Sequence, residues 1–235
     1  MRVAILVPAR AEGDAVAATL RRVASVAPEV GGARVYLVDD GSDPPIELAD
    51  LPPATASFDV VLLRHVVNLG QGAALETARQ CATAVGGAGE HEVFVTMDAD
   101  GQHDPRDLVA LVAAIDGGAD AAFGNRFAGR SRVPPARAAL LWGARLFELA
   151  LTGRALGDAH NGYRAFSAKA IRGITIRQAR MAHATEIRMR ARRLEVVEVP
   201  VTVLYTEETR RKGQSSLGSV HILRDLFLRF LFGGS

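Results

Sequence analysis

The sequence is poor in cysteine, lysine and aromatic residues. Its 235 residues include one cysteine, Cys81, which excludes an internal disulfide framework and suits a reducing compartment. Lysine occurs only at Lys169 and Lys212, so arginine carries almost all of the positive charge. Aromatic residues make up 6% of the chain and no known nucleic-acid-binding motif occurs, so no nucleic acid is expected as a partner.

Long apolar runs are also missing. No stretch reaches the roughly 18 consecutive apolar residues of a membrane-spanning helix, so no transmembrane helix is predicted. The opening MRVAILVPARAEG has only a short apolar run followed by polar residues, which indicates a first β-strand rather than a signal peptide. We therefore expect a cytoplasmic protein, or one that is peripheral on the inner face of the cell membrane.

Each half of the chain is short of one sign of charge. Residues 1–120 carry 8 Arg against 18 Asp and Glu, whereas residues 121–235 carry 20 Lys and Arg against 8 Asp and Glu. An acidic half can hold a cation, and a basic half can face phosphate groups or an anionic membrane surface. Solvated helix faces are the plainer explanation of the same split.

What the chain does contain is a regular alternation of apolar strands and helices. Strands are predicted at 2–7, 34–38, 60–63, 93–97 and 119–123, with helices at 14–26, 70–85 and 106–115, and Pro8 is expected to end the first strand. Such βαβ units form a largely parallel sheet, whose ligands bind beyond the carboxyl ends of the strands. The polar segments of this half fall at those ends: Arg10 to Glu12, Asp39 to Ser42, Asn68 to Gly72, Asp98 to Gln102 and Asn125-Arg126.

The stretch Glu92–Pro105, EVFVTMDADGQHDP, carries the most specific signal in this half. It reads as a buried strand that runs into two acidic residues, Asp98 and Asp100. Side chains two apart in an extended chain point the same way, so both carboxylates face one spot and repel each other unless a cation lies between them. Hard oxygen ligands select Mg²⁺ or Mn²⁺, and Gln102 adds a neutral oxygen nearby.

Other protein classes also use Asp-x-Asp, and a lone copy is often a solvated loop. A calcium EF-hand loop requires glycine at its sixth position and glutamate at its twelfth, where this chain has His103 and Val109. A haloacid-dehalogenase-like phosphatase has its Asp-x-Asp-Gly early in the domain and followed by Thr. Here Gln102 follows the glycine, and the motif lies far along the chain.

The pattern changes after Arg126. Helices are predicted at 138–152, 183–193 and 220–232, and one or two strands at 196–204. Between them lie a basic loop at 129–137, the polar segment GDAHNGYRAF at 157–166 and a charged loop at 206–219. With no internal repeat and no low-complexity linker, one domain with a C-terminal extension is the simplest arrangement.

Seven motifs in this order resemble the family 2 glycosyltransferases of the GT-A fold, most of all the polyprenyl-phosphate (dolichyl-phosphate-like) sugar transferases. The motifs are LVPARAEG (6–13), LVDDGSD (37–43), NLGQGAALETA (68–78), VTMDADGQHDP (95–105), FGNRFAG (123–129), GDAHNGYRAF (157–166) and EVPVTVLYTEETRRKGQSS (198–216). The resemblance implies an α/β, Rossmann-like domain over residues 1–216, with a mostly parallel central sheet flanked by helices. Residues 1–126 would form its nucleotide-sugar half and residues 127–216 its acceptor half.

Residues 217–235 are expected to form a C-terminal amphipathic helix. Our first expectation is that this helix packs on the core. A position in a membrane interface or against another subunit is the alternative.

The resemblance also implies roles for single residues. Asp40 would hydrogen-bond the base, Arg126 would lie near phosphates, and Asp98 and Asp100 would engage the ribose and a diphosphate held by Mg²⁺ or Mn²⁺. Gln102 would complete the metal shell. The implied substrate-binding residues are Pro8, Ala9, Arg10, Glu12, Asp40, Gly70, Gln71, Asp98, Ala99, Asp100, Arg126, Tyr163, Arg164, Arg211, Lys212 and Ser215.

The predicted reaction is an inverting, metal-dependent transfer of a sugar from a UDP or GDP sugar. A polyprenyl phosphate is the expected acceptor, at a membrane surface or beside a membrane-protein partner. A saccharide, natural-product or protein hydroxyl is the alternative acceptor. A phosphate-ester hydrolase and a non-catalytic nucleotide-sugar-binding subunit remain as alternatives of other classes.

The catalytic candidates are Asp158, Arg126 and Glu186. A phosphate acceptor is already an anion, whereas a hydroxyl needs a carboxylate base, for which Asp158 or Glu186 is the candidate. Their plainer roles are a turn cap for Asp158 and a helix-surface acid for Glu186. Two residues depart from the family pattern: Arg10 replaces an aromatic residue near the base, and Gln71 stands where lysine is common.

Overall fold

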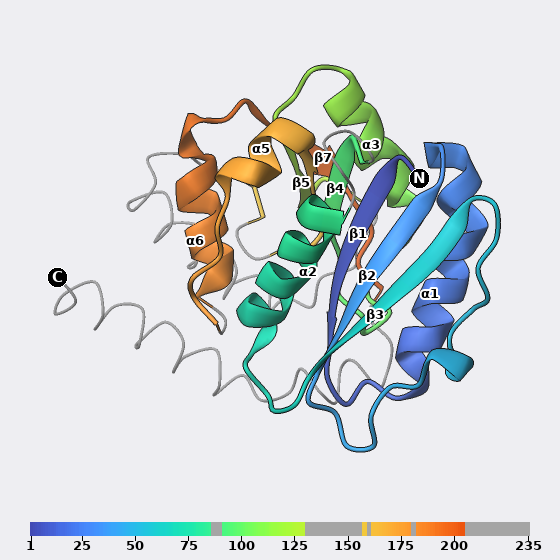
Figure 1. Ribbon diagram of the computed structural model, residues 1–235. Coiled ribbons are helices and arrows are strands. Elements are labelled where there is room, and N and C mark those ends of the chain that lie inside the picture. The colour runs from blue at the N-terminus through green and yellow to red at the C-terminus, as the bar shows by residue number, and fades with distance from the viewer. Residues whose placement is uncertain (86–90, 130–156, 159–160, 180–181, 205–235) are drawn as a thin grey trace, which may run out of the picture.

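The computed structural model describes residues 1–85, 91–129, 157–158, 161–179 and 182–204, which form one sheet with helices on both faces (Figure 1). The predicted helices at 138–152 and 220–232, the loop at 206–219 and the proposed extension at 217–235 lie outside these residues.

The sheet has seven strands in the order β3-β2-β1-β4-β6-β5-β7. The strands are β1 (Val3–Ala9), β2 (Ala33–Asp40), β3 (Phe58–His65), β4 (Val93–Thr96), β5 (Ala121–Asn125), β6 (Arg164–Ser167) and β7 (Val196–Pro200). β6 is antiparallel to both of its neighbours, β4 and β5, and all other neighbouring pairs are parallel. The expected mostly parallel α/β sheet is therefore confirmed.

The helices predicted in the described part of the chain are also confirmed. They are α1 (Asp14–Val26), α2 (Gln71–Val85), α3 (Asp107–Asp116) and α6 (His183–Arg190). A short helix α5 (Ala168–Gly173) follows β6, and three 3-10 turns occur at η1 (Ala27–Val30), η2 (Leu48–Asp50) and η3 (Ala191–Arg193). α1 forms where predicted because its apolar residues recur at helical spacing and face the sheet.

Two features of the sheet differ from the sequence-based expectation. Pro8 does not end the first strand, because it lies inside β1 and pairs with Val38 of β2. The pairing between β1 and β4 ends at Leu6, so Pro8, which has no backbone N–H, is tolerated two positions later. β6 was not expected, since its four residues are too few to show a period and are buried along most of their length.

The sheet separates two apolar cores. α1 and α3 cover one face of the sheet, and α2, α5 and α6 cover the other (Figure 1). Apolar side chains of each group of helices pack against the strands. Successive residues of β1 alternate between the cores: Ile5 belongs to the first and Leu6 to the second. Because both faces of the central strands are covered, these strands read as continuous apolar runs in the sequence.

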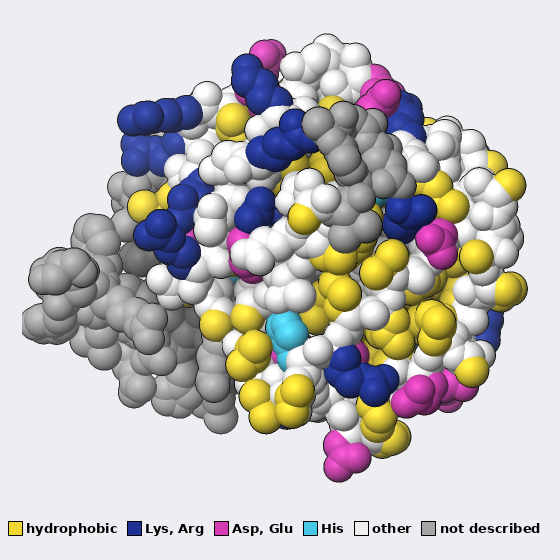
Figure 2. Space-filling model, viewed as in Figure 1, with side chains coloured by type: hydrophobic (Ala, Val, Ile, Leu, Met, Phe, Trp, Pro, Cys, Tyr) yellow, Lys and Arg dark blue, Asp and Glu magenta, His cyan; other side chains and the backbone are white. Residues whose placement is uncertain are grey.

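Some of the basic residues of the second half lie exposed around α5 and α6. Figure 2 shows Lys and Arg side chains gathered on that part of the surface. The exposed basic residues there are Lys169, Arg172, Arg177, Arg192 and Arg193. In the part of the chain that the structure describes, no helix combines the length and the apolarity needed to cross a bilayer.

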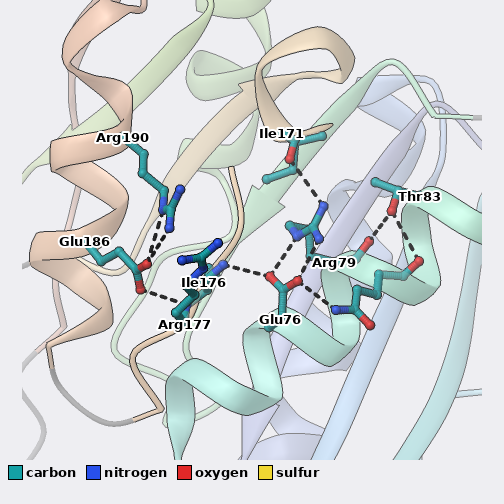
Figure 3. A network of polar contacts seen from close by, with 9 residues as sticks. Glu76, Arg79, Thr83, Ile171, Ile176, Arg177, Glu186 and Arg190 are labelled. Atoms are coloured by element: carbon teal, nitrogen blue, oxygen red, sulfur yellow. Dashed lines mark hydrogen bonds and ion pairs between the residues drawn. The ribbon is translucent and has the colours of Figure 1, made fainter. Parts of the chain in front are cut away.

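A network of hydrogen bonds connects α2 and α6 to the chain at 176–178 (Figure 3). Glu76 of α2 accepts hydrogen bonds from Arg79 at 2.7 and 2.8 Å, from Gln80 at 2.8 Å and from the backbone N–H of Ile176 at 2.9 Å. Burial by itself raises the pKa of Glu76, but these hydrogen bonds outweigh it and the pKa is lowered. The ionised carboxylate therefore stabilises the fold.

We expect Glu76→Gln to lower the free energy of unfolding at neutral pH by about 2 kcal/mol, because Arg79 loses its largely buried carboxylate partner. The folded-state pKa of Glu76 is depressed, so its stabilisation is complete above the ordinary value of 4.5 and is lost as pH falls through the folded-state value. Urea unfolding across that pH range measures both effects. Glu29→Gln, at an exposed glutamate, is the control, and an equal loss in both variants would contradict the expectation.

Candidate functional site

The carboxyl ends of β1, β2, β3 and β4 bring the predicted polar segments to one edge of the sheet. The segments contact one another there. The N–H of Ala11 donates to Ser42 Oγ at 3.0 Å, the loop at 66–70 bonds to Asp40, and Gln71 bonds to Asp98. The loops that follow these four strands therefore form one connected group, as the sequence predicts for a parallel sheet.

Asp98 follows β4, and both of its carboxylate oxygens are hydrogen-bonded. Oδ1 accepts from Gln71 Nε2 at 2.9 Å, and Oδ2 lies 3.1 Å from His103 Nε2. Burial raises the pKa of Asp98, but the hydrogen bond from His103 and the nearby His103, His183 and Arg164 outweigh it. The pKa is lowered, so Asp98 is held as a carboxylate.

The chain at Gly162 packs directly against this carboxylate. A Cβ at Gly162 would lie 2.7 Å from Asp98 Oδ2, which is closer than real Cβ contacts. Thr96 Oγ1 at the end of β4 donates to the Gly162 carbonyl at 2.6 Å. Glycine therefore allows the segment that leads into β6 to lie against Asp98.

Asp100 has the opposite electrostatic environment. Its oxygens accept from the backbone N–H of Gln102 at 3.0 Å and from Gln102 Nε2 at 2.7 Å. Burial and the charge of Asp98 raise the pKa of Asp100, and the hydrogen bond from Gln102 offsets them only in part. The negative charge of Asp98 is thus balanced by its neighbours, whereas the described residues balance the charge of Asp100 poorly.

The chemistry of these side chains fits a hard divalent cation. Asp98, Asp100 and Gln102 offer carboxylate and amide oxygens, and a cation would relieve the repulsion that raises the pKa of Asp100. Within the described ranges, no three His, Cys, Asp or Glu side chains form a ready metal cage. Mg²⁺ is usually bound by one or two carboxylates together with substrate phosphates, and carboxylate oxygens also suit Mn²⁺.

The two aspartates at the end of β2 hold the loops around them. Asp39 accepts from the backbone N–H groups of Ser42 and Ile46, both at 3.0 Å. Asp40 accepts from the N–H groups of Leu69 at 2.9 Å and Gly70 at 2.7 Å, and it also bonds to His65. Both oxygens of Asp40 already carry contacts within the protein, and its hydrogen bond to a base stays a prediction.

A buried ion pair lies beyond the end of β5. Arg126 donates to Asp158 Oδ2 from Nε at 2.5 Å and from its backbone N–H at 3.1 Å, and Asn161 Nδ2 donates to the same oxygen at 3.3 Å. Arg126 is 6% exposed and Asp158 is 4% exposed. Among the described residues, no donor reaches the second oxygen, Asp158 Oδ1. The structure therefore brings together two of the three catalytic candidates.

The segment 161–164 joins this ion pair to Asp98. Arg164 is buried at the start of β6, with its guanidinium carbon 5.6 Å from the centre of the Phe123 ring. Burial lowers the pKa of Arg164 to about 10 against the opposing effect of Asp98 and Asp158, so the guanidinium is charged at neutral pH. Tyr163 is fully buried against His103. Substrate contacts of Tyr163 and Arg164 stay predictions, because both side chains lie in the interior.

Glu186, the third catalytic candidate, belongs to the network of Figure 3. Its carboxylate accepts from the backbone N–H groups of Arg177 and Gln178, both at 2.8 Å, and from Arg190. Burial raises the pKa of Glu186, but these hydrogen bonds outweigh it and the pKa is lowered. A lowered pKa makes a carboxylate a weaker base.

The other predicted substrate-binding residues fall into four groups. Pro8, Ala9 and Ala99 are buried, Arg10 is exposed, and Glu12 and Gly70 are partly exposed. Arg211, Lys212 and Ser215 lie outside the described residues. Their roles stay predictions.

Sequence reasoning did not assign roles to Ser42, His65 or Gly162. The signals that pointed to them were weak. Ser42 and His65 are polar residues at strand ends, and Gly162 is a glycine in a polar segment that precedes a buried strand. Their contacts join segments that are far apart in the chain, and periodicity cannot reveal such contacts.

Comparison with known proteins identifies relatives over most of the chain. The family model described as "Glycosyl transferase family 2" matches residues 4–175. The polyprenol monophosphomannose synthase of Mycolicibacterium smegmatis is 31% identical over 235 residues, covering 96% of this chain and 84% of that protein. The undecaprenyl-phosphate mannosyltransferase of Micrococcus luteus is 30% identical over 225 residues, covering 91% of this chain and 88% of that protein.

A solved structure shares the fold. Glucosyl-3-phosphoglycerate synthase from Mycobacterium tuberculosis, in complex with Mn²⁺ and uridine-diphosphate-glucose, superposes with a TM-score of 0.56 at 17% identity. The match covers 97% of this chain and 78% of that structure. At this identity the likeness concerns the fold alone.

The aspartate pair leads to two predictions of opposite sign. In EDTA at neutral pH, we expect Asp100→Asn to raise the free energy of unfolding by about 1 kcal/mol, because it removes a carboxylate that the protein alone compensates poorly. Asp98→Asn should lower it by a similar or larger amount, because Gln71 and His103 lose a charged acceptor. Urea unfolding of both variants checks this, and two changes of the same sign would refute it.

Proposed function

The chain belongs to glycosyl transferase family 2 and has the GT-A fold, and on that premise we propose that it moves a sugar from a nucleoside-diphosphate sugar to a polyprenyl phosphate. The observation that carries the proposal is the pairing of two sites at one edge of the sheet. Asp98 and Asp100 form a pair suited to a cation and a diphosphate. The segment 161–164 joins this pair to the buried ion pair of Arg126 and Asp158. The names of the two mannosyltransferase relatives support a lipid phosphate as acceptor and make mannose the first sugar to test.

The donor diphosphate is proposed to bind at Asp98 and Asp100, which with Gln102 would hold Mg²⁺ or Mn²⁺. When bound, such a cation neutralises the charge that develops on the departing nucleoside diphosphate. Gln71 and His103 keep Asp98 ionised and oriented before any ligand arrives, so little reorganisation is needed there. The raised pKa of Asp100 and the solved relative with Mn²⁺ and UDP-glucose support this assignment.

The acceptor phosphate is proposed to bind at Arg126. Asp158 and the Arg126 backbone fix the plane of the guanidinium, and a fixed planar fork suits a phosphate group. A phosphate oxygen is already an anion, so the reaction needs no general base. In this proposal Asp158 orients Arg126 and Glu186 orders the 177–178 backbone, and neither abstracts a proton.

The proposed chemistry is a single displacement. An oxygen of the acceptor phosphate bonds to the anomeric carbon, while the bond from that carbon to the diphosphate oxygen breaks and its electron pair leaves with the nucleoside diphosphate. Attack from the face opposite the leaving group inverts the anomeric configuration. Family membership removes the phosphate-ester hydrolase reading, and a hydroxyl acceptor is the alternative that the experiments below address.

We propose that the protein acts at the inner face of the cell membrane as a peripheral protein. The exposed basic residues over α5 and α6 support this, because anionic lipid headgroups attract clustered arginine and lysine (Figure 2). Pelleting with phosphatidylglycerol vesicles, and with neutral phosphatidylcholine vesicles as the control, tests the placement.

The donor is identified by calorimetric titration of UDP-, GDP- and dTDP-sugars, beginning with the mannose and glucose forms. We expect one of them to bind with Mg²⁺ or Mn²⁺ and to lose at least about tenfold in affinity in EDTA or in Asp100→Asn, because the diphosphate charge is no longer neutralised. Asp59→Asn is the control, since Asp59 pairs with Arg34 at the opposite end of the strands. Absence of binding by any of these nucleotide sugars to the folded protein would refute the donor assignment.

The acceptor is identified by incubating the donor with a short-chain polyprenyl phosphate or with the matching polyprenol. We expect transfer to the phosphate only, with inverted configuration by NMR, and a fall in kcat/KM of about tenfold or more in Arg126→Lys, because lysine cannot form the bidentate contact. Transfer to the alcohol would support the hydroxyl alternative. Donor binding without transfer to either acceptor would instead indicate a binding subunit.

A further inference from the structure

The ends of β2 and β3 carry a chain of hydrogen bonds to which the proposed function gives no role. His65, the last residue of β3, is paired in register with Asp40, the last residue of β2. Its Nδ1 lies 2.8 Å from Asp40 Oδ1, and its Nε2 lies 2.9 Å from Thr77 Oγ1 in α2. The side chain of His65 is 10% exposed and that of Asp40 is 4% exposed. One imidazole therefore connects the sheet to the helix that begins at Gln71.

The partners determine how this imidazole is hydrogen-bonded. Ionised Asp40 only accepts, so Nδ1 donates to it, and the hydroxyl of Thr77 then donates to Nε2 of a neutral ring. Burial raises the pKa of Asp40, but the hydrogen bonds from His65, Leu69 and Gly70 outweigh it and the pKa is lowered. Both ring nitrogens have a partner, which fixes the orientation of the ring.

Asp40 also holds the loop between β3 and α2. Its oxygens accept the N–H groups of Leu69 and Gly70. The loop lies directly on the turn after β2, because a Cβ at Gly41 would be 2.7 Å from the backbone of Val67 and Asn68. Gly41 has φ +69°, a conformation that suits glycine.

The loop has little other support. The side chains of Val66, Val67 and Leu69 are 97%, 61% and 49% exposed, so burial of apolar surface does not define their positions. Loops with few buried contacts depend on backbone hydrogen bonds for their conformation. The residue that follows the loop, Gln71, donates to Asp98 Oδ1 at 2.9 Å. The loop therefore leads from the Asp40 contacts to the aspartate pair.

We propose that His65 is a positioning residue for the donor site, which orients Asp40 so that the 66–70 loop and Gln71 hold Asp98 in place. The inference rests on the proposed function, because the donor is the ligand that reports on it. It also gives Asp40 an indirect role, as the anchor of the loop, that does not require contact with a base. Thr77 contacts Nε2 on the far side of the ring, and the contact of Nδ1 to Asp40 is the one that positions the loop.

Two amide substitutions separate the two contacts of His65. The amide of asparagine overlies Nδ1 of histidine, so His65→Asn keeps a donor for Asp40 and loses Thr77. The amide of glutamine overlies Nε2, so His65→Gln keeps a partner for Thr77 and loses Asp40. We expect His65→Gln to weaken metal-dependent binding of the nucleotide sugar by about tenfold, and His65→Asn to stay within about threefold of the wild type.

A matched control separates positioning from loss of stability. His91 is also buried with a partner on each ring nitrogen, Met1 O at 2.7 Å and Tyr36 Oη at 2.8 Å, but it lies at the amino end of the strands. His91→Gln should lower the melting temperature and leave donor affinity unchanged. Thr77→Val and Thr83→Val form a second pair on α2, since the Thr83 hydroxyl donates to the carbonyls of Arg79 and Gln80 in its own helix.

Hydrogen exchange on the ligand-free protein gives a readout that does not depend on the donor. We expect the amides of Leu69 and Gly70 to lose protection in His65→Gln and to keep it in His65→Asn and His91→Gln. Unchanged protection in His65→Gln, or equal donor affinity in His65→Gln and His91→Gln, would overturn the inference. If the wild type binds no nucleotide sugar, the proposed function fails, and hydrogen exchange alone decides whether His65 holds the loop.

Discussion

The repulsion between two carboxylates at the end of one buried strand is the constraint on which the site depends. Asp98 is compensated by Gln71 from α2 and by His103 from the chain that follows it, whereas the hydrogen bonds to Asp100 among the described residues come from Gln102. The protein thus keeps one acid ionised by its own contacts and leaves the other poorly compensated. We propose that a ligand that brings positive charge completes this site, and that the contacts of Gln71 and His103 hold Asp98 steady while that ligand binds.

Buried acids also shape the loops around the site. Asp39 and Asp40 accept four backbone N–H groups from the chain after β2 and β3, and Asp158 accepts the backbone N–H of Arg126. Each carboxylate takes N–H groups that the sheet ladder leaves without a partner, so the loops need few buried apolar side chains. This explains how Val66 and Val67 can be exposed on a loop that still has a defined path.

The antiparallel strand β6 joins the two halves of the site. It enters the sheet between β4 and β5, and the turn before it places Gly162 against Asp98 and Asn161 against Asp158. Arg164 then lies between these acids as a buried positive charge. In a sheet with β5 directly beside β4, no such segment would lie between the aspartate pair and the ion pair of Arg126 and Asp158. The chain after residue 126 also contacts the first half elsewhere: the N–H of Ile176 donates to Glu76, and the N–H of Leu204 donates to the carbonyl of Gln102.

The sequence by itself determined the sheet, the helices of its first half and the place of the site. Apolar strands alternating with amphipathic helices allow only βαβ units, and such units put every polar strand end at one edge, so Asp98, Asp100 and Gln71 could be expected together. Tertiary structure alone decided which groups the buried acids contact. The backbone N–H groups that Asp40 and Glu186 accept, and the contacts of His65 and Gly162 between distant segments, became visible only in the structure. The local sequence sets helix and strand propensity and the spacing of apolar residues. The partner of a buried polar group depends instead on which segments the fold brings within hydrogen-bonding distance.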